Sequence, residues 1–431
     1  MTARFGITAR QPRVGEEMGV LATVAVMQSA QRLPLRQVLV CAAAELAIGM
    51  GIRHGFGLWL LPVTQSQGWG REVFGLAMAV QNLAWGVFGI FAGMLADRFG
   101  AFRVLLAGSG FYAAGLAGMA YAPTPLLFAF TAGILIGAAQ AGTTYAVVYG
   151  VIGRQLEPQR RSWAMGVTAA TGSFGQFLMV PVEGLLIRGV GWQEALLVLA
   201  ALSLLIVPLA WGLREPGFAR GTAPAREQTL GQAVREAARY PSFQLLMAGY
   251  FVCGFQLVFI GVHMPGYLKD HGLSPQVASY ALALIGLFNI VGTFGAGALG
   301  QRFTRPRILA GIYLTRAVAI ALFLWAPLSP MSVYVFASAM GLLWLSTVPP
   351  TNAVLAQIFG VAHLSMLSGF VFFSHQVGAF LGVWLGGFLY DRTGSYDVVW
   401  YLSILLGVFA AAVNLPVRET PIRRAPQPQP A

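Results

Sequence analysis

The stretch Gly93-Met-Leu-Ala-Asp-Arg-Phe-Gly-Ala-Phe-Arg103 occurs a second time in related form, as Gly297-Ala-Leu-Gly-Gln-Arg-Phe-Thr-Arg-Pro-Arg307. The two copies are 204 residues apart, and five of their eleven positions are identical. An offset of 203 residues likewise superposes Gly175, Phe177, Leu178, Gly184 and Gly191 on Gly378, Phe380, Leu381, Gly387 and Gly394. Self-similarity at a fixed offset indicates an internal repeat, so the chain is predicted to consist of two related halves.

The sequence around both copies is strongly apolar. Of the 431 residues, 57% are hydrophobic and 10% are charged, whereas about 25% of the residues of a soluble domain are charged. A bilayer core requires roughly 20 apolar residues per helix. The sequence therefore predicts an all-α membrane protein with twelve transmembrane helices in two pseudo-symmetric six-helix bundles. The predicted helices cover residues 38–62, 73–95, 104–121, 126–152, 163–187, 195–213, 243–268, 277–299, 308–326, 333–359, 364–390 and 398–417.

Lys and Arg are distributed unevenly among the segments that connect these helices. With both termini on one side, the segments on that side hold 21 of the 27 Lys and Arg residues. The segments on the other side hold Arg71, Arg188, Lys269 and Arg392. Cations that flank membrane helices are retained on the cytoplasmic side. Both termini are therefore predicted to be cytoplasmic, in the inner membrane of a bacterium.

Polar segments divide the chain into five parts. We expect a cytoplasmic N-terminal tail at 1–37, a six-helix bundle at 38–213, a cytoplasmic central loop at 214–241, a second bundle at 242–417 and a disordered, Pro-rich cytoplasmic tail at 418–431. The central loop carries five Arg residues and is predicted to contain a short surface helix near 230–239.

The stretch from Gly93 to Arg103 resembles the signature loop between the second and third helices of the major facilitator superfamily. The resemblance implies the twelve-helix fold of that family and the transport of a small solute through a central cavity. It also implies a conformational latch, in which the acidic residue pairs at a neighbouring helix end and the arginines hold the two halves in the outward-open state. The latch residues are Gly93, Asp97, Arg98, Gly100 and Arg103.

Three further motifs resemble the bacterial monocarboxylate and oxalate/formate-type porters. They are Gly51-Ile-Arg-His-Gly-Phe-Gly57, Arg161-Ser-Trp-Ala-Met-Gly166 and Tyr390-Asp-Arg-Thr-Gly-Ser-Tyr396. The resemblance implies a monocarboxylate substrate. The helix 277–299 departs from the pattern, because Asn289 and Thr293 stand where an acid and a carboxylate-binding Arg are expected.

Few ionisable side chains lie inside the predicted helices, and each costs at least about 2.5–3.5 kcal/mol there unless it has a partner or a wet cavity. Arg53 lies near mid-membrane beside His54. Its planar guanidinium matches a carboxylate, so Arg53 is the candidate anion anchor. Alternatively, Arg53 is satisfied by backbone carbonyls or by Glu45, two turns away. Glu45, His263 and His375 are the candidate proton carriers, and each histidine could equally be a packed residue that bonds across helices.

Uncharged polar and aromatic side chains complete the candidate cavity. The candidate substrate-binding residues are Arg53, His54, Gln81, Asn82, Gln140, Tyr145, Tyr149, Gln176, Asn289, Trp344, Asn352, His375 and Gln376, and Gln256 is a further polar residue of the set. Amides and phenols also form ordinary hydrogen bonds between membrane helices, worth about 0.6 kcal/mol on average. Part of this set is therefore expected to be structural.

Other unusual residues in the helices have more than one explanation. Arg316 lies in a helix that is peripheral in the family, which favours a packing or lipid-interface role. Glu183 lies near the outer end of its helix and is either a gate acid or exposed to water. Pro181 and the run Val348-Pro-Pro350 interrupt backbone hydrogen bonding, and bending there suits alternating access.

Several functions are disfavoured by what the sequence lacks. It contains no Gly-rich phosphate loop, metal-binding His/Cys cluster or nucleophile triad, so we expect no enzyme activity, no cofactor and no metal. The net charge of +12 does not indicate a nucleic-acid partner, because the cations lie between apolar segments. Cys41 and Cys253 lie inside apolar helices and indicate no disulfide framework. The expected partners are a small solute, the lipid bilayer and, with coupling, protons, and the chain is expected to be a monomer.

These observations predict secondary active transport of a small organic anion, such as a monocarboxylate, by alternating access. Proton symport is the coupling considered. One alternative is a neutral or aromatic solute, such as a vitamin, held by amides and aromatic rings. The other is a non-transporting membrane sensor, which would need a soluble signalling domain larger than the central loop 214–241.

Overall fold

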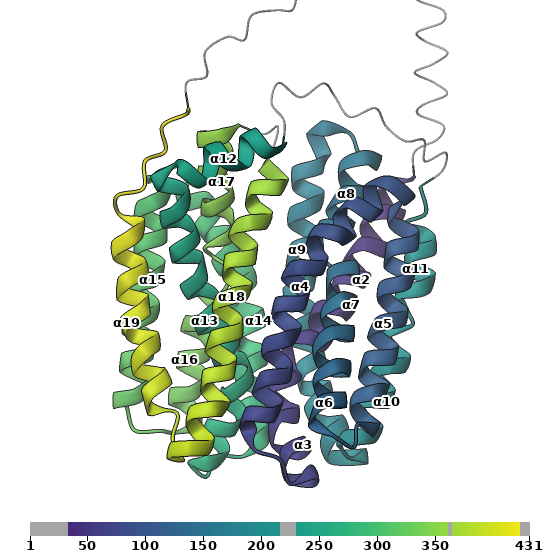
Figure 1. Cartoon of the computed structure of the whole chain (residues 1–431), viewed down its shortest axis with the longest axis vertical. Helices are drawn as coiled ribbons and strands as arrows, with labels where there is room; N and C mark the ends of the chain where they lie inside the picture. Colours follow the sequence, from purple (N-terminus) through teal and green to yellow (C-terminus); the bar gives the residue numbers. More distant parts are fainter. Residues whose placement is uncertain (1–32, 216–229, 361–363, 423–431) are drawn as a thin grey trace, which may run out of the picture.

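The computed structural model describes residues 33–215, 230–360 and 364–422. The predicted N-terminal tail, the centre of the predicted central loop and the predicted C-terminal tail fall mostly outside these ranges. Within them the chain is helical almost throughout and contains no β-strand. Figure 1 shows long helices running side by side, with the first half of the chain grouped beside the second half.

Six of the membrane-crossing segments belong to the first half of the chain. Several are built from consecutive shorter helices separated by a break. In chain order the elements are α2 (Leu35–His54), η1 (Phe56–Trp59), α3 (Leu60–Gln67), α4 (Arg71–Phe99), α5 (Ala101–Tyr121), α6 (Pro125–Phe128), η2 (Ala129–Leu135), α7 (Ile136–Gly142), α8 (Tyr145–Gln155), α9 (Pro158–Val190), α10 (Trp192–Ser203) and α11 (Ile206–Gly212).

The second half repeats this arrangement after a short helix in the connection. Its elements are α12 (Leu230–Arg239), α13 (Pro241–Asp270), α14 (Pro275–Leu299), α15 (Arg305–Trp325), α16 (Pro330–Leu343), α17 (Val348–Phe359), α18 (Leu364–Thr393) and α19 (Asp397–Asn414). The predicted surface helix near 230–239 is confirmed as α12, which packs against α13 through buried Ala233 and Ala237.

Twelve helical segments of the described residues are long and apolar enough to cross a membrane. This confirms the predicted number of helices and the fold class. The ends differ by a few residues. The first segment runs over Leu35–Gln67 rather than 38–62, and the last helix ends at Asn414 rather than at 417. Large apolar side chains such as Leu126 and Trp325 are exposed on the outside of the protein, which agrees with a lipid environment.

The helices of each half pack on one another, and the halves meet mainly along two pairs of helices and where η1 packs on α13. In the first half α2 packs on α9 and α5 on α10, and in the second half α13 packs on α18 and α15 on α19. The two halves contact each other where α4 packs on α18 and where α9 packs on α14. Gly75 of α4 lies so close to α18 that an added Cβ would be 2.9 Å from the Val383 carbonyl oxygen. Small residues allow this close approach of membrane helices.

The internal repeat extends into the helix interiors. The fourth membrane segment breaks between α7 and α8 at Thr143 and Thr144. The tenth breaks between α16 and α17, which begins directly after Thr347. Thr143 and Thr347 are 204 residues apart, the same offset that relates the two signature stretches. Interrupted helices at matching positions in two halves are typical of transporters, where such breaks lie near the substrate site.

Arg316 stabilises the break in the tenth segment. The side chain is fully buried, so the packing role is confirmed and the lipid-interface role is wrong. Nη2 donates to the carbonyl oxygens of Leu343 (2.5 Å) and Trp344 (2.6 Å), and Nη1 lies 3.3 Å from the Cys253 sulfur. The arginine thus pairs carbonyl groups that the end of α16 leaves without helical partners. Pro349 and Pro350 lie in the first turn of α17, where an amide proton is not needed.

Replacing Arg316 by methionine is expected to destabilise the protein, because it leaves the two carbonyl groups buried and unpaired. Each unpaired group costs about 1–3 kcal/mol. Thermal unfolding in detergent should show a clearly lower midpoint for Arg316→Met and an intermediate one for Arg316→Lys, which keeps the charge but not the fork. Arg307→Met is the matched control, because Arg307 is exposed on the same helix. Equal midpoints for Arg316→Met and Arg307→Met would contradict this role.

Candidate functional site

Arg53 lies near the middle of the first membrane segment, just before the break between α2 and η1. It is half-buried, and Nη2 donates to Oδ1 of Asn82 at 2.8 Å. Its Nε atom is buried without a hydrogen-bond partner. Among the described residues, no ion pair includes Arg53. The alternative that Glu45 neutralises Arg53 is therefore not realised in this conformation.

An aromatic chain connects Arg53 to the second half of the protein. The guanidinium carbon lies 4.5 Å from the centre of the Trp85 ring, within the range of a cation–π contact. Trp85 meets Phe372 of α18 edge-on, with ring centres 5.1 Å apart. Phe372 stacks on His375 at 5.8 Å. The sequence analysis did not select Trp85 or Phe372. Trp85 follows Asn82 by three positions on the same helix, which places it on the same face.

The candidate amides of the first half form a buried cluster beside Arg53. Gln81 donates to the Ala132 carbonyl (2.7 Å) and accepts from Gln140 (3.2 Å), whose own Oε1 has no partner. Asn82 donates to the Met78 carbonyl at 2.8 Å while it accepts from Arg53. These amides position Arg53, and Gln140 retains an unused acceptor.

Other candidates in the first half make bonds to the protein itself. The His54 Nδ1 atom is 2.7 Å from the Met50 carbonyl of its own helix. Tyr145 and Tyr149 lie side by side with ring centres 5.5 Å apart, and the Tyr149 hydroxyl donates to the Met165 carbonyl. Tyr145 and Tyr149 thus form an aromatic surface on α8.

Two candidates serve the contact between the halves or the helix break. Gln176 of α9 donates to the Leu282 carbonyl of α14 at 2.9 Å. Asn289 of α14 donates to the Ser173 hydroxyl at 2.8 Å and accepts from the Leu345 amide at 2.9 Å. Asn289, which stands where an acid is expected in the porters, thus joins α14 to α9 and to the break in the tenth segment.

The remaining candidates of the second half lie on α17, α18 and the break before α17. Trp344 is buried, and its carbonyl accepts from Arg316. Asn352 accepts from the Ser368 hydroxyl at 2.6 Å. His375 shares a hydrogen bond of 3.0 Å with Gln376 Oε1, and the Gln376 Nε2 atom is buried without a partner. Gln376 therefore retains an unused donor, as Gln140 retains an unused acceptor.

Two buried acids have no hydrogen-bond partner among the residues that the structure describes. Glu45 on α2 and Glu183 on α9 are both 0% exposed, and none of their four carboxylate oxygens has a hydrogen-bond partner. The expectation that Glu183 could be exposed to water is wrong in this conformation. Gln256 donates to the Ser403 carbonyl, which gives it a structural role between α13 and α19.

The predicted latch residues lie at the end of the molecule opposite Arg71, and the pairs seen there stay within one half. Asp97 pairs with Arg154 at 2.8 Å, and Arg154 also pairs with Glu215. Arg98 lies over the Phe99 ring, and Arg103 is exposed. Of the latch glycines, Gly93 lies inside α4 and Gly100 directly follows its last residue, with a φ of 88°, a backbone conformation that favours glycine.

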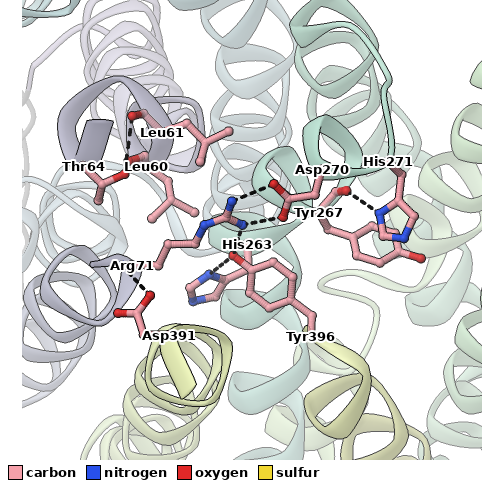
Figure 2. Close-up of polar contacts among 10 residues, drawn as sticks. All are labelled: Leu60, Leu61, Thr64, Arg71, His263, Tyr267, Asp270, His271, Asp391 and Tyr396. Carbon is pink, nitrogen blue, oxygen red and sulfur yellow. Dashed lines mark hydrogen bonds and ion pairs between the residues drawn. The ribbon is translucent and has the colours of Figure 1, made fainter. Parts of the chain in front are cut away.

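At the other end, named here the Arg71 end, the two halves are tied together (Figure 2). Arg71 at the start of α4 forms two hydrogen bonds of 2.7 Å to the carboxylate of Asp270 at the end of α13. Its Nη1 also donates to the Tyr396 hydroxyl at 2.9 Å, and the guanidinium lies 3.7 Å from the centre of the Tyr390 ring. A two-point arginine–carboxylate contact of this kind combines charge with defined geometry.

Asp391 completes this connection. Its carboxylate accepts from the backbone amides of Arg71 at 2.9 Å and Glu72 at 2.8 Å. The side chain therefore caps the first turn of α4 from the other half of the protein, where a negative charge is favourable. Asp391, Tyr390 and Tyr396 all belong to the motif that resembles the porters, so the structure gives that motif a role in closing the Arg71 end.

His263 lies behind this connection and is buried. Its Nε2 is 2.7 Å from the Val383 carbonyl, so Nε2 carries the proton and Nδ1 accepts from the Tyr396 hydroxyl at 3.3 Å. Burial raises the pKa of Tyr396 well above its usual value despite the neighbouring Arg71 charge, so the hydroxyl keeps its proton. His263 thus bonds across helices, as one of the two interpretations of its sequence position expects.

A two-bundle, twelve-helix membrane protein with a mid-membrane arginine and broken helices at matching positions has the architecture of a secondary transporter. The family model of the Major Facilitator Superfamily matches residues 41–351 and 246–431, and the chain belongs to this superfamily. Its relatives are named as transporters, so the chain is a transporter and not an enzyme.

Three relatives illustrate the breadth of the similarity. The chain is 24% identical over 381 residues to an uncharacterized MFS-type transporter, YcxA, of Bacillus subtilis, covering 86% of this chain and 92% of the relative. It is 28% identical over 330 residues to monocarboxylate transporter 13 of Rattus norvegicus, with 75% of each chain covered. It is 26% identical over 384 residues to a probable sulfoacetate transporter, SauU, of Cupriavidus necator, covering 79% of this chain and 86% of the relative.

A solved structure shares the fold. A bacterial homologue of the human lysosomal transporter Spinster, described as inward-facing and unoccupied, superposes with a TM-score of 0.72 at 16% sequence identity. The match covers 88% of this chain and 95% of the other. The architecture of the two halves is thus shared with a known transporter.

Proposed function

We propose that this protein is a secondary transporter of a small organic anion and that Arg53 binds the carboxylate. The observation that carries the proposal is the state of Arg53: a guanidinium near mid-membrane, with an unpartnered Nε and no acidic partner among the described residues. A charge in this position is costly unless something neutralises it. An anionic substrate would provide that charge when it binds.

The surroundings of Arg53 support a substrate with one charged and one apolar end. Asn82 holds the guanidinium in place, and Trp85 and Phe372 provide aromatic surface next to it. Monocarboxylates combine these two features, and the relatives named as monocarboxylate and sulfoacetate transporters point to the same chemistry. The unused acceptor of Gln140 and donor of Gln376 offer further polar contacts.

The proposed cycle is alternating access, in which the two halves rock about the site. With the Arg71 end on the outside of a bacterial inner membrane, as the cation distribution predicts, the present conformation is closed to the outside. The latch stretch around Asp97 would then lie on the cytoplasmic side, with both termini. Glu45 and His375 are the proton carriers that we propose, and the protein works as a monomer.

Uptake into proteoliposomes tests the proposal. Purified protein should accumulate radiolabelled pyruvate or another monocarboxylate from a panel, more strongly at low external pH. Competing carboxylates should inhibit the uptake. Uptake of a neutral aromatic solute, without inhibition by carboxylates and without pH dependence, would favour the neutral-solute alternative and reject the anion proposal. No uptake of any solute tested, with correctly folded protein, would also reject it.

The proposed orientation has a simple chemical test, because Lys269 is the single lysine of the chain. Lys269 is exposed next to Asp270 at the Arg71 end. A membrane-impermeant amine reagent should label it on intact cells. Lys269→Arg is the matched control, since it should lose the external label and leave only the terminal amine as a target. Labelling that requires permeabilised cells would place the Arg71 end inside and reverse the orientation.

A further inference from the structure

Glu183 is a buried acid that has no role in the substrate site proposed around Arg53. Its side chain is 0% exposed, and both carboxylate oxygens lack a hydrogen-bond partner. It lies on α9 directly against Gly55, where an added Cβ would overlap the Glu183 carboxylate. Gly55 is the residue at which α2 ends and η1 begins. The acid therefore packs on the break of the first segment, two residues beyond Arg53.

The second half of the protein covers this region. The backbone of η1 at Gly57 packs against Gly261 and Val262 of α13. Gly184, next to Glu183, packs against Ser279 of α14, whose hydroxyl donates to the Val180 carbonyl at 3.1 Å. Both contacts join the two halves. Separation of the halves at the Arg71 end would uncover the first-segment break and admit water to Glu183.

Nothing in the described surroundings neutralises an ionised Glu183. The titratable groups near this part of α9 are Arg53 and His54 at the end of α2, Tyr280 of α14, Glu194 of α10 and Arg188 further along α9, and Tyr112 of α5 shows an electrostatic effect from Glu183. Arg53 donates to Asn82, and the Tyr112 hydroxyl donates to the Gly49 carbonyl at 3.1 Å. Among the described residues no ion pair includes Glu183.

A carboxylate without a partner inside a membrane protein costs several kcal/mol and is neutralised by a proton instead. The conformation seen here therefore contains neutral Glu183. When the Arg71 end is open to water, the ionised form is solvated and the cost disappears. Closing the Arg71 end thus requires that Glu183 first bind a proton from the water on that side.

We propose that Glu183 is the proton-loading residue of the transport cycle: its protonation at the open Arg71 end permits the two halves to close over the first-segment break. This assignment rests on the proposed transport function. It adds a proton site that depends on conformation, on the side of Arg53 opposite Glu45.

A distance measurement without substrate tests the assignment. Spin labels on Ser66→Cys of α3 and Gln276→Cys of α14 report the opening of the Arg71 end, since both positions are exposed there in different halves. The background carries Cys41→Ser and Cys253→Ser. If one proton is involved, each unit increase in pH should lower the ratio of closed to open protein by up to about tenfold once Glu183 ionises. The ratio is measured from about pH 5 to about pH 9.

Glu183→Gln mimics the protonated form and should remain closed across this range, with a ratio that changes by less than about twofold. Glu194→Gln, an exposed acid on the adjacent α10, is the matched control and should keep the pH response. Glu183→Asp keeps a titratable carboxylate and should also respond. If Glu183→Gln shows the same pH response of the closed-to-open ratio as the wild type, the assignment is overturned. If Glu183→Gln does not fold, loss of the pH response in Glu183→Asp overturns it instead. Because no substrate is present, these results are independent of whether organic anions are transported.

Discussion

Replacing Arg53 by alanine is expected to lower organic-anion uptake at least about 100-fold without unfolding the protein. Hydrogen bonds to a charged group contribute about 1.5–3 kcal/mol each, and about 1.4 kcal/mol corresponds to a tenfold change in affinity. A carboxylate held at two points therefore loses about two orders of magnitude or more. Initial uptake rates of a labelled monocarboxylate into proteoliposomes, measured over a range of concentrations, give the size of the loss in Arg53→Ala.

Arg53→Lys separates charge from geometry. Lysine keeps the positive charge but cannot present two parallel donors to one carboxylate, so we expect a loss of about tenfold, mostly in apparent affinity. Arg188→Ala is the matched control, because Arg188 is exposed at the end of α9 and should not affect uptake. If Arg53→Ala transported the same anion at the wild-type rate, Arg53 would not be the anchor.

The fold was predictable because the membrane sets a length that the sequence must meet. Each of the twelve predicted helices corresponds to a segment of the structure. The breaks inside the first and fourth segments were not predicted, since residues such as Thr143 and Thr144 are compatible with a continuous helix, whereas the run Val348-Pro-Pro350 did indicate an interruption of the tenth segment. In the structure these breaks depend on side chains from other helices, including Arg316, whose partners Leu343 and Trp344 are 27 and 28 residues away.

The candidate site was only partly predictable. An arginine inside an apolar segment is rare enough to select Arg53 directly. Its partner Asn82 was also selected, because amides are uncommon in such helices. Phe372 could not be selected, since one phenylalanine among 29 carries no signal until the fold brings α18 beside α4.

The connection at the Arg71 end was missed for a different reason. The sequence analysis used Arg71 only as a cation that reports orientation. Its partners Asp270 and Asp391 are 199 and 320 residues away in the chain, and no local pattern links residues over that distance. The resemblance of the motif around Asp391 to the porters was the one available signal, and it did not indicate a contact with α4.

Arg71→Met is therefore expected to open the Arg71 end. The substitution removes the two hydrogen bonds to Asp270, the bond to Tyr396 and the contact with the Tyr390 ring. The side chains of Arg71 and Asp270 are 11% and 28% exposed, so partial solvent screening places each bond near the lower limit of about 1.5 kcal/mol. Even one such contribution shifts the ratio of open to closed protein about tenfold.

The rate at which a buried cysteine reacts measures this ratio. Val262 is 7% exposed and packs against the η1 backbone of the other half, so Val262→Cys should react with an impermeant maleimide only when the Arg71 end opens. In a background without native cysteines, Arg71→Met should increase the rate at least about tenfold, and Asp270→Asn should increase it less because Tyr396 still holds Arg71. Arg188→Met should leave it unchanged.

An unchanged rate in Arg71→Met would mean that the contacts of Arg71 form only after other contacts have closed this end. Asp391→Asn then tests the helix cap, because it weakens the cap on the first turn of α4 and leaves Arg71 in place. A faster reaction in Asp391→Asn alone would assign the closure to the helix cap. A faster reaction in both Arg71→Met and Asp391→Asn would indicate that α13, through Asp270, and α18, through Asp391, each hold α4 in place. Opening of the Arg71 end would then require both helices of the second half to separate from α4.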